Sequence, residues 1–174
     1  MGLTNLKKEL NKLEKSKLIE VVLELYKKNK SVKDYFDFYI NPNEKELFNK
    51  YQKIVFESFY PKRGFGLKLK EGKQAIIDFK KFEPSTLLLS DLMLYYVETG
   101  VKFTNDFGDI DENFYVSVEK MFIQALTLMN KEDILDEFSE RALKVVSDAD
   151  GTGWGFFDSL ASIHSEFYWD DSQE

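Results

Sequence analysis

The sequence predicts an all-α protein, because apolar residues recur at helical spacing along the chain and show no sustained alternation. Proline and glycine divide this pattern into about eight or nine helices with short connections. Consecutive short helices favour antiparallel hairpins that form a compact bundle or a short α–α superhelix. No repeat of fixed period is present, so a repeat protein is not established.

The composition is that of a folded domain. With 174 residues, 43% apolar and 16% aromatic, the chain is long and apolar enough for a core, and we expect a single all-α domain over residues 1–174 with a frayed acidic tail at 170–174. It has no cysteine and one histidine, which excludes disulfides, thiol nucleophiles and multi-histidine metal sites. The longest apolar stretch, Leu87–Val97, is too short to cross a bilayer, and no signal peptide begins the chain, so we expect a soluble cytoplasmic protein.

Three short helices are expected in residues 1–40. Ser16 and Ser31 have side chains that helix N-termini prefer, so we expect them to cap the second helix and the third, Val32–Ile40. Pro42 ends the third helix, because proline disfavours helical geometry in the residue before it. The residues expected on the buried faces of the first two helices are Leu3, Leu6, Leu10, Leu13, Leu18, Ile19, Val22, Leu25 and Tyr26.

Two helices and a basic loop follow. Asn43 is expected to cap a longer helix that Pro61 ends. The segment Lys62–Lys70 contains glycines and basic residues and is expected to be a loop. A helix from about Glu71 to Phe82 comes next, before Pro84.

The segment Thr86–Thr99 is apolar nearly all round, which predicts a central helix covered by its neighbours. We expect Gly100 and a loop at residues 105–111 to end this region, and Asp111 to cap the following helix. The apolar stripes of the remaining helices are Phe114, Val118, Phe122, Ala125 and Met129, then Ile134, Leu135, Phe138, Ala142 and Val146, and finally Phe156, Leu160, Ile163 and Phe167.

Charge is distributed unevenly between the two halves. Residues 1–81 contain 19 Lys and Arg against 11 Asp and Glu, a net charge of +8, whereas residues 82–174 contain 5 against 20, a net charge of −15. This asymmetry indicates either a surface for polyanions or two faces that attract each other. We expect the charges to interleave partly at the rims of the hairpins, with much of the acidic excess on the C-terminal helices.

The basic loop contains the string Lys62-Arg63-Gly64-Phe65-Gly66, which is similar to the start of an RNA-recognition signature. That signature needs a β-strand to present its aromatic residues, and this string lies between helices, so we reject it. A weaker hypothesis is that the loop binds a phosphate or an acidic partner, and the simpler interpretation is a solvated loop. The candidate residues of this loop are Lys62, Arg63, Phe65, Lys68 and Lys70.

Two acidic segments have the residue types of cation sites. The string Asp148–Gly153 matches the first half of a calcium-binding EF-hand loop, but Ser159 stands where the loop needs a bidentate glutamate. We therefore expect a helix-breaking turn. The acidic residues at 106–112 suit a helix N-terminus, and we expect no metal site and no cofactor.

Trp154 lies between Gly153 and Gly155, an unusual position for a large aromatic residue. We expect a tight turn that places Trp154 and Phe156 on the core, and the alternative is an aromatic lip on a binding groove. His164 borders the last apolar stripe and is expected to be partly buried with one hydrogen bond. No catalytic constellation is present in the sequence.

Several strings spread over most of the chain resemble a known family: Leu6–Leu10 with Leu18–Glu20, Asp91–Glu98, Gly108–Glu112 with Phe114-Tyr115, and Gly153–Phe156. In these strings the chain resembles an uncharacterised bacterial family of all-helical domains of unknown function. The resemblance implies an all-α fold and carries over no catalytic residue.

We therefore expect a non-enzymatic domain that binds a protein partner, without membrane association; its oligomeric state is not indicated. The first alternative is a polyanion or nucleic-acid binder that uses the basic half, although the calculated pI of 4.9 argues against general affinity for nucleic acid. The second is a metal-dependent or enzymatic role for the acidic half. A continuous basic face would favour the first alternative, and a pocket with converging carboxylates the second.

Overall fold

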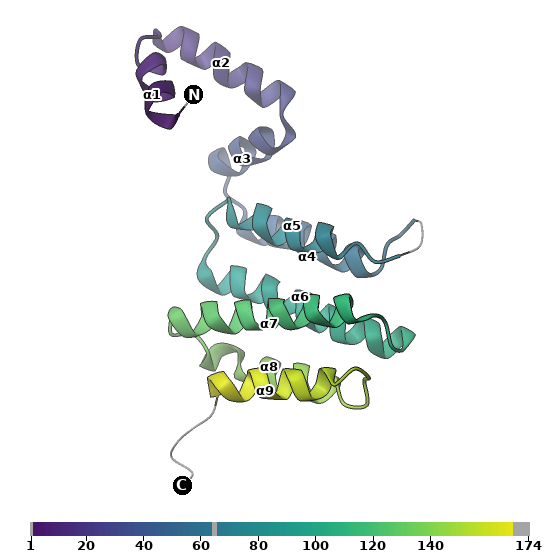
Figure 1. Ribbon diagram of the computed structural model, residues 1–174. Helices are drawn as coiled ribbons and strands as arrows, with labels where there is room; N and C mark the ends of the chain where they lie inside the picture. Colours follow the sequence, from purple (N-terminus) through teal and green to yellow (C-terminus); the bar gives the residue numbers. More distant parts are fainter. Residues whose placement is uncertain (1, 64–65, 169–174) are drawn as a thin grey trace. The chain divides into compact units, whose positions relative to one another are not determined.

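The computed structural model describes residues 2–63 and 66–168, and every regular element in these ranges is a helix (Figure 1). The predicted all-α fold is confirmed. By their contacts the residues divide into two compact units between Asn43 and Glu44, each of which is described by itself. The expected single domain over residues 1–174 stays a prediction. The frayed tail expected at 170–174 lies outside the described residues.

The N-terminal unit contains helices α1 (Leu3–Leu10), α2 (Lys15–Lys28) and α3 (Lys30–Ile40). Both predicted serine caps are wrong. Helix α2 begins one residue before Ser16, and α3 begins one residue before Ser31. The extended backbone of Asn29, with φ −129° and ψ 111°, alone separates α2 from α3. Ser31 instead donates a hydrogen bond from Oγ to Oδ1 of Asn29, at 2.9 Å.

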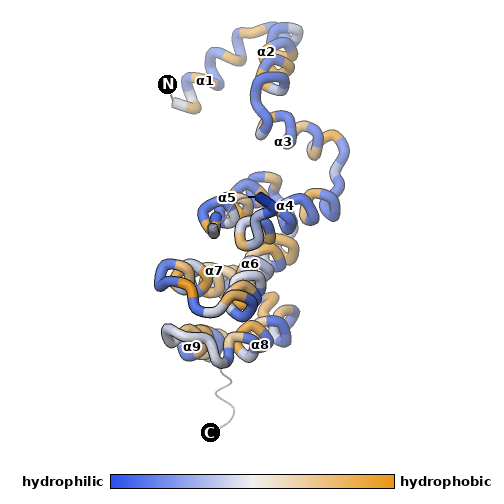
Figure 2. Tube along the Cα trace, turned by 90° about the vertical axis from the view of Figure 1, so that its right-hand side faces the viewer, coloured by the Kyte–Doolittle hydropathy of each residue, from blue (hydrophilic) through white to orange (hydrophobic). Residues whose placement is uncertain are grey.

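No residue of α1, α2 or α3 is buried, contrary to the expectation from their apolar stripes. The hydroxyl of Tyr26 donates a hydrogen bond to Oδ1 of Asp37, at 2.7 Å, and this contact joins α2 to α3. Apolar and polar residues alternate in patches along all three helices (Figure 2). The helical periodicity was therefore predictive of the elements, but the residues of their apolar stripes are exposed or half-buried.

Residues 44–168 form three hairpins stacked in layers (Figure 1). The hairpins pair α4 (Glu44–Phe59) with α5 (Leu69–Lys80), α6 (Thr86–Phe107) with α7 (Glu112–Lys131), and α8 (Ser139–Asp148) with α9 (Phe156–Tyr168). A single turn of 3₁₀ helix, Asp136–Phe138, precedes α8. Helix α6 contacts α4, α5, α7 and α8, so the middle hairpin holds the two outer ones.

Helix α6 is the predicted central helix, and its full burial is confirmed for Leu92, Leu94 and Val97. Its predicted end is wrong, because the helix continues through Gly100 to Phe107. A Cβ atom on Gly100 would lie 2.6 Å from Cγ2 of Val118 on α7. Glycine at this position therefore lets two helices cross closely and does not mark a helix terminus.

The other helix boundaries follow from local hydrogen bonds. Asp111 caps α7 as predicted, since its Oδ1 accepts a hydrogen bond from the backbone N–H of Phe114 at 3.0 Å. Helix α5 begins at Leu69, two residues earlier than expected, because the N–H of Lys68 donates to the carbonyl of Ser58 at 2.8 Å and fixes the chain there. Within the described ranges, no helix has the length and apolar character needed to cross a membrane.

The substitution Gly100→Ala tests whether close packing fixes this glycine. In an ordinary helix, alanine in place of glycine gains about 1 kcal/mol. We expect instead a loss of about 1–3 kcal/mol in the free energy of unfolding, because the new methyl group overlaps Val118. Urea unfolding of the single variant and of Gly100→Ala/Val118→Ala measures this, and the second change should recover part of the loss. A stabilised single variant would contradict the close approach.

Candidate functional site

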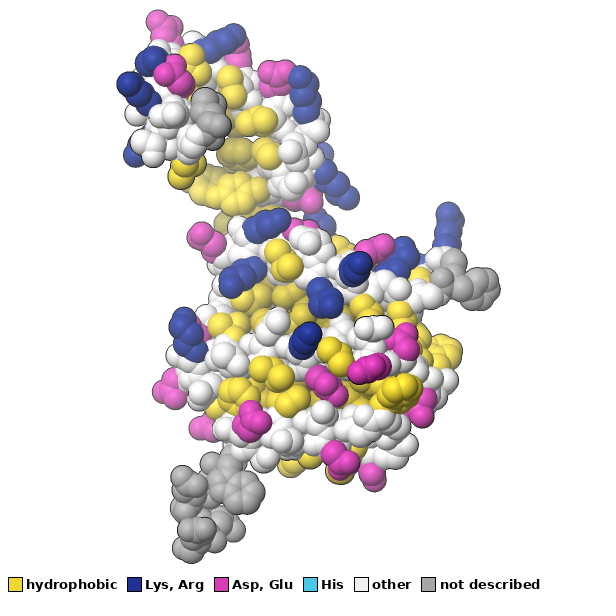
Figure 3. Space-filling model, viewed as in Figure 1, with side chains coloured by type: hydrophobic (Ala, Val, Ile, Leu, Met, Phe, Trp, Pro, Cys, Tyr) yellow, Lys and Arg dark blue, Asp and Glu magenta, His cyan; other side chains and the backbone are white. Residues whose placement is uncertain are grey.

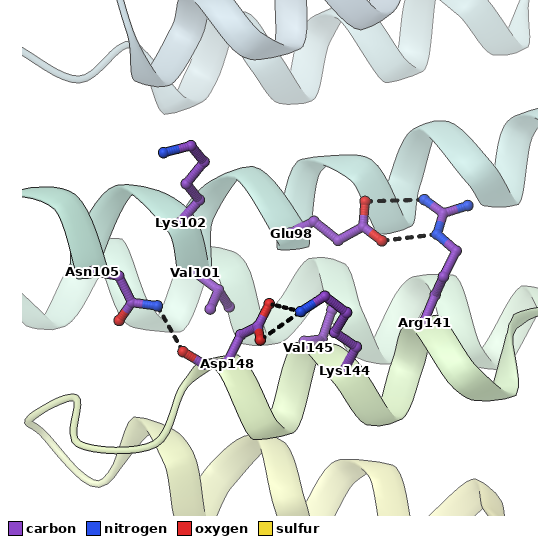
Figure 4. Close-up of a pocket in the computed structure, with 8 residues that line it drawn as sticks. All are labelled: Glu98, Val101, Lys102, Asn105, Arg141, Lys144, Val145 and Asp148. Carbon is purple, nitrogen blue, oxygen red and sulfur yellow. Dashed lines mark hydrogen bonds and ion pairs between the residues drawn. The ribbon is translucent and has the colours of Figure 1, made fainter.

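A pocket of about 440 Å³ opens between α6 and α8 (Figure 4). Helix α6 contributes Glu98, Val101, Lys102 and Asn105, and helix α8 contributes Arg141, Lys144, Val145 and Asp148. Two apolar side chains form part of its wall, and the other six are polar or charged. The pocket therefore combines carboxylates and cations from two layers of the stack.

Arg141 is the main link across this pocket. Its Nε and Nη2 donate to Oε1 and Oε2 of Glu98 at 2.8 and 3.0 Å, and its Nη1 donates to Oδ1 of Asp91 at 2.7 Å. The guanidinium also lies 5.8 Å from the ring centre of Phe138. The hydrogen bonds with Glu98, and then Asp91, raise the pKa of Arg141 above its ordinary value against the effect of burial. Arg141 therefore stays charged and ties α8 to α6.

The remaining charges of the pocket are also paired. Nζ of Lys144 lies 2.8 and 2.9 Å from the two carboxylate oxygens of Asp148, and Nζ of Lys102 lies 2.6 Å from Oδ2 of Asp106. The side chain of Asn105 donates to the backbone carbonyl of Asp148 at 2.6 Å. Both carboxylates that line the pocket thus have a cationic partner. In residues 2–63 and 66–168 no group of three or more acidic or histidine side chains is arranged to hold a metal ion.

The turn before α9 is attached to the loop after α6 through Asp109. Oδ1 of Asp109 accepts hydrogen bonds from the hydroxyl of Tyr115 and from the N–H of Gly153, both at 2.9 Å. A Cβ atom on Gly153 would lie 2.3 Å from Oδ2 of Asp109, so a larger residue would have to displace this carboxylate. This contact and the Lys144–Asp148 ion pair give the 148–153 turn a structural role, as the sequence predicted.

Trp154 lies outside the core, so the expected burial of this residue is wrong. Its side chain is 64% exposed and its φ is +59°, whereas Phe156 is fully buried as predicted. A positive φ is uncommon for a large aromatic residue, and the contact of Gly153 with Asp109 fixes the backbone beside it. Trp154 is not among the residues that line the α6–α8 pocket, so it does not form a lip of that pocket.

Some candidate residues of the basic loop are already paired with a carboxylate. Lys62 lies 2.9 Å from Oε1 of Glu57, and Lys68 lies 3.4 Å from Oε1 of Glu71. Arg63 and Lys70 are exposed and make no ion pair with the described residues. Phe65 lies outside the described residues. The loop therefore contributes exposed cations, half of which have an adjacent carboxylate.

Charge is distributed unevenly over the layers of residues 44–168. Lysine and arginine gather over α4 and α5, and aspartate and glutamate predominate over the layers below (Figure 3). Each ion pair named for residues 44–168 joins two residues of the same half of the chain, for example Lys81 with Asp78 and Arg141 with Glu98. None of these named pairs joins the basic half to the acidic half, and the expected partial interleaving at the rims of the hairpins stays a prediction.

An exposed aromatic cluster, which the sequence reasoning missed, lies where α4 ends beside α6. It consists of Phe56, Tyr60, Phe103 and Phe107, with ring centres 4.8 Å apart for Phe56–Tyr60, 5.3 Å for Tyr60–Phe103 and 4.7 Å for Phe103–Phe107. Oδ2 of Asp106 accepts from the Tyr60 hydroxyl at 2.6 Å. Burial and then this hydrogen bond raise the pKa of Tyr60. The i, i+4 spacing of aromatic residues at two helix ends was the available signal.

The largest set of exposed apolar side chains is in the N-terminal unit, and we call it the N-terminal apolar surface. Its members are 38–84% exposed: Leu3, Leu6, Leu13, Ile19, Val22, Leu23, Leu25, Tyr35, Tyr39 and Ile40. The rings of Tyr35 and Tyr39 stack with their centres 6.3 Å apart. Sequence reasoning identified the stripes of the first two helices but interpreted them as core.

His164 stacks on Tyr168, with ring centres 4.6 Å apart. The expected hydrogen bond is not found between His164 and the described residues. Burial lowers the pKa of His164 below its ordinary value of 6.5. The nearby Tyr168 hydroxyl instead donates to the carbonyl of Leu135 at 2.9 Å.

Protonation of His164 makes the stability of the folded chain depend on pH in a direction that can be derived. Because its pKa is lower in the folded chain, the unfolded chain binds the proton more readily, and stability falls as the pH drops below about 6.5 toward the folded-state pKa. His164 is the one histidine of the chain, so His164→Phe should remove this dependence and keep the aromatic stack. Urea unfolding at several pH values between about 8 and 5.5 measures the difference. Equal slopes in both proteins would contradict it.

Arg141 and Lys144 provide a matched comparison of ion pairs. We expect Arg141→Lys to lower the free energy of unfolding by about 1–2 kcal/mol, because lysine loses the bidentate geometry that joins two layers. Lys144→Met breaks an exposed pair within one helix and should change it by less than about 0.5 kcal/mol. Chemical denaturation of both variants measures these changes. Equal changes in the free energy of unfolding would show that the cross-layer pair stabilises the fold no more than an exposed pair within one helix.

No curated protein and no solved structure matches the chain. A family model matches residues 1–168, which is nearly the whole length. The chain therefore belongs to a family of unknown function, DUF6155.

Proposed function

We propose that this protein is a non-enzymatic protein-interaction domain of the cytoplasm, and that its N-terminal unit is the docking element. The observation that carries the proposal is that α1, α2 and α3 bury no residue although each has an apolar face. Residues 44–168, in contrast, have a complete core of their own.

The energetics of short helices support this proposal. Isolated helices of 8–14 residues, the lengths of α1 to α3, are marginal in water. Fixing each residue costs about 1–2 kcal/mol of conformational entropy, which burial of apolar area must offset. A segment of this size with no buried side chain cannot supply that offset alone. A second surface that covers the N-terminal apolar surface would supply it.

The charges of the N-terminal unit favour a protein over a polyanion. Three of its lysines lie beside acids nearby in sequence, in the pairs Lys12–Glu9, Lys17–Glu20 and Lys28–Glu24. Residues 1–43 contain nine Lys against six Asp and Glu, a net charge of only +3. A phosphate backbone is bound by an excess of cations, and the excess in this unit is small.

The polyanion alternative has one supporting observation, the lysines and arginines that gather over α4 and α5 (Figure 3). The exposed Arg63 and Lys70 would be its contacts. Retention on heparin at low salt, lost in Arg63→Gln/Lys70→Gln, would support it. The enzymatic alternative has less support, because the carboxylates of the α6–α8 pocket are paired with Arg141 and Lys144.

Site-specific photo-crosslinking in the native cells tests the proposal. A benzophenone amino acid replaces Tyr39, which is 69% exposed, and the matched control positions are Ile77 and Leu143, which are 53% and 58% exposed on the other unit. We expect crosslinked protein species of discrete mass from position 39, and only background from the two controls. Equal background at all three positions would refute a docking role for the N-terminal unit.

A further inference from the structure

We propose that the partner of the N-terminal apolar surface is a second copy of this chain, so that two N-terminal units pack through their apolar faces into a closed twofold dimer. This inference rests on the proposed function and names its partner. Three properties of the unit carry it: the area of its apolar surface, the shape of that surface and its charge.

The area is sufficient for a stable dimer. Ten large side chains are exposed by 38–84% in the N-terminal unit. At up to about 150–250 Å² for a fully exposed aromatic side chain, and less for an aliphatic one, they present roughly 800 Å² of surface. A standard protein interface buries about 800 Å² on each partner. One additional N-terminal unit of the same size would therefore cover this surface.

The shape of the surface fits another helical face. Leucine, isoleucine and valine recur on α1 and α2 at three- and four-residue steps, the spacing at which ridges of one helix enter grooves of the next. The described pocket of this protein is lined by residues of α6 and α8. A small molecule would need such a concave site, whereas an amphipathic helical unit needs a complementary face. A second copy offers that face by symmetry.

The charge of the unit permits self-association. A net charge of +3 on residues 1–43, with lysines beside acids at Lys17–Glu20 and Lys28–Glu24, gives two copies little mutual repulsion. Residues 44–174 carry a net charge of −10, so their contact with the same residues of another copy is disfavoured. Electrostatic repulsion between two copies is therefore smallest when they approach through their N-terminal units. The nine lysines of this unit are accompanied by six acids, whereas helices that bind anionic lipid have a polar face rich in lysine and arginine.

Light scattering coupled to size-exclusion chromatography tests the dimer on the full chain. The wild type should have the mass of two chains over a wide range of concentration. The variant Ile19→Glu/Leu23→Glu places two charges on one face of α2, at side chains that are 49% and 50% exposed, and should have the mass of one chain. Glutamate is a good helix former, so α2 should keep its structure.

The matched control is Ile77→Glu/Leu143→Glu, which adds the same charge at similarly exposed positions of residues 44–168 and should remain a dimer. Circular dichroism confirms that each variant keeps its helical content. A wild type with the mass of one chain, an Ile19/Leu23 variant that remains dimeric, or wild-type species larger than two chains would each overturn the proposal. Binding of a monomeric wild type to phosphatidylserine vesicles would assign the surface to lipid and would also overturn it.

The mass of the crosslinked species from position 39 separates the two proposals. A species of twice the chain mass supports the dimer. A discrete species of another mass supports the docking role but overturns the second copy as its partner. The absence of any species above the controls contradicts both.

Discussion

Burial of one helix, α6, is the interaction on which the folded body depends. It contacts the two helices before it and the two after it, so all three layers of residues 44–168 meet on its surface. Most of its length between Leu89 and Thr104 is buried. Some polar groups that it carries inside the core are satisfied by a neighbour, as when the hydroxyls of Tyr96 and Ser117 meet at 3.0 Å, whereas Oγ of the buried Ser90 has no hydrogen-bond partner among the described residues.

Close helix crossing and charge pairing contribute at different places in this body. At the α6–α7 crossing, Gly100 brings Val118 and the ring of Phe59 against the helix, so packing there is dense and apolar. At the rim between α6 and α8, Arg141 makes charge-assisted hydrogen bonds to carboxylates more than 40 residues away in sequence. Elsewhere the ion pairs are local. The named ion pairs therefore lie within one half of the chain and do not join the basic half to the acidic half.

The sequence was sufficient for features that depend on neighbours along the chain. The apolar pattern identified α6, and Asp111 identified the start of α7, because both signals act within one or two turns of helix. It failed where a distant residue decides the structure. Gly100 was expected to end a helix, because its close contact with Val118 on another helix is not visible in the neighbouring sequence. Trp154 was expected in the core, because the hydrogen bond between the adjacent Gly153 and the distant Asp109 is not visible there either.

The candidate sites show the same division between local and distant information. Apolar stripes on α1 and α2 could be predicted residue by residue, but periodicity does not state which surface covers a stripe. The α6–α8 pocket could not be predicted, because its lining depends on how two hairpins are aligned against each other. Tertiary packing determines that alignment, and local sequence does not. The paired aromatic residues at 56, 60, 103 and 107 were visible as a spacing, yet their meeting depends on the α4–α6 contact.

The two units differ in whether the apolar side chains at helical spacing are covered. In residues 44–168, apolar side chains at helical spacing are covered by other helices of the same unit, and scattered exposed ones such as Ile77 and Leu143 are ordinary for a protein surface. In residues 3–40 the same spacing produces ten exposed side chains and no buried one. The same pattern serves folding in one unit and is left exposed in the other. Because burial of apolar area is the main favourable term in both folding and association, the N-terminal unit is the part of the chain in which binding would complete folding.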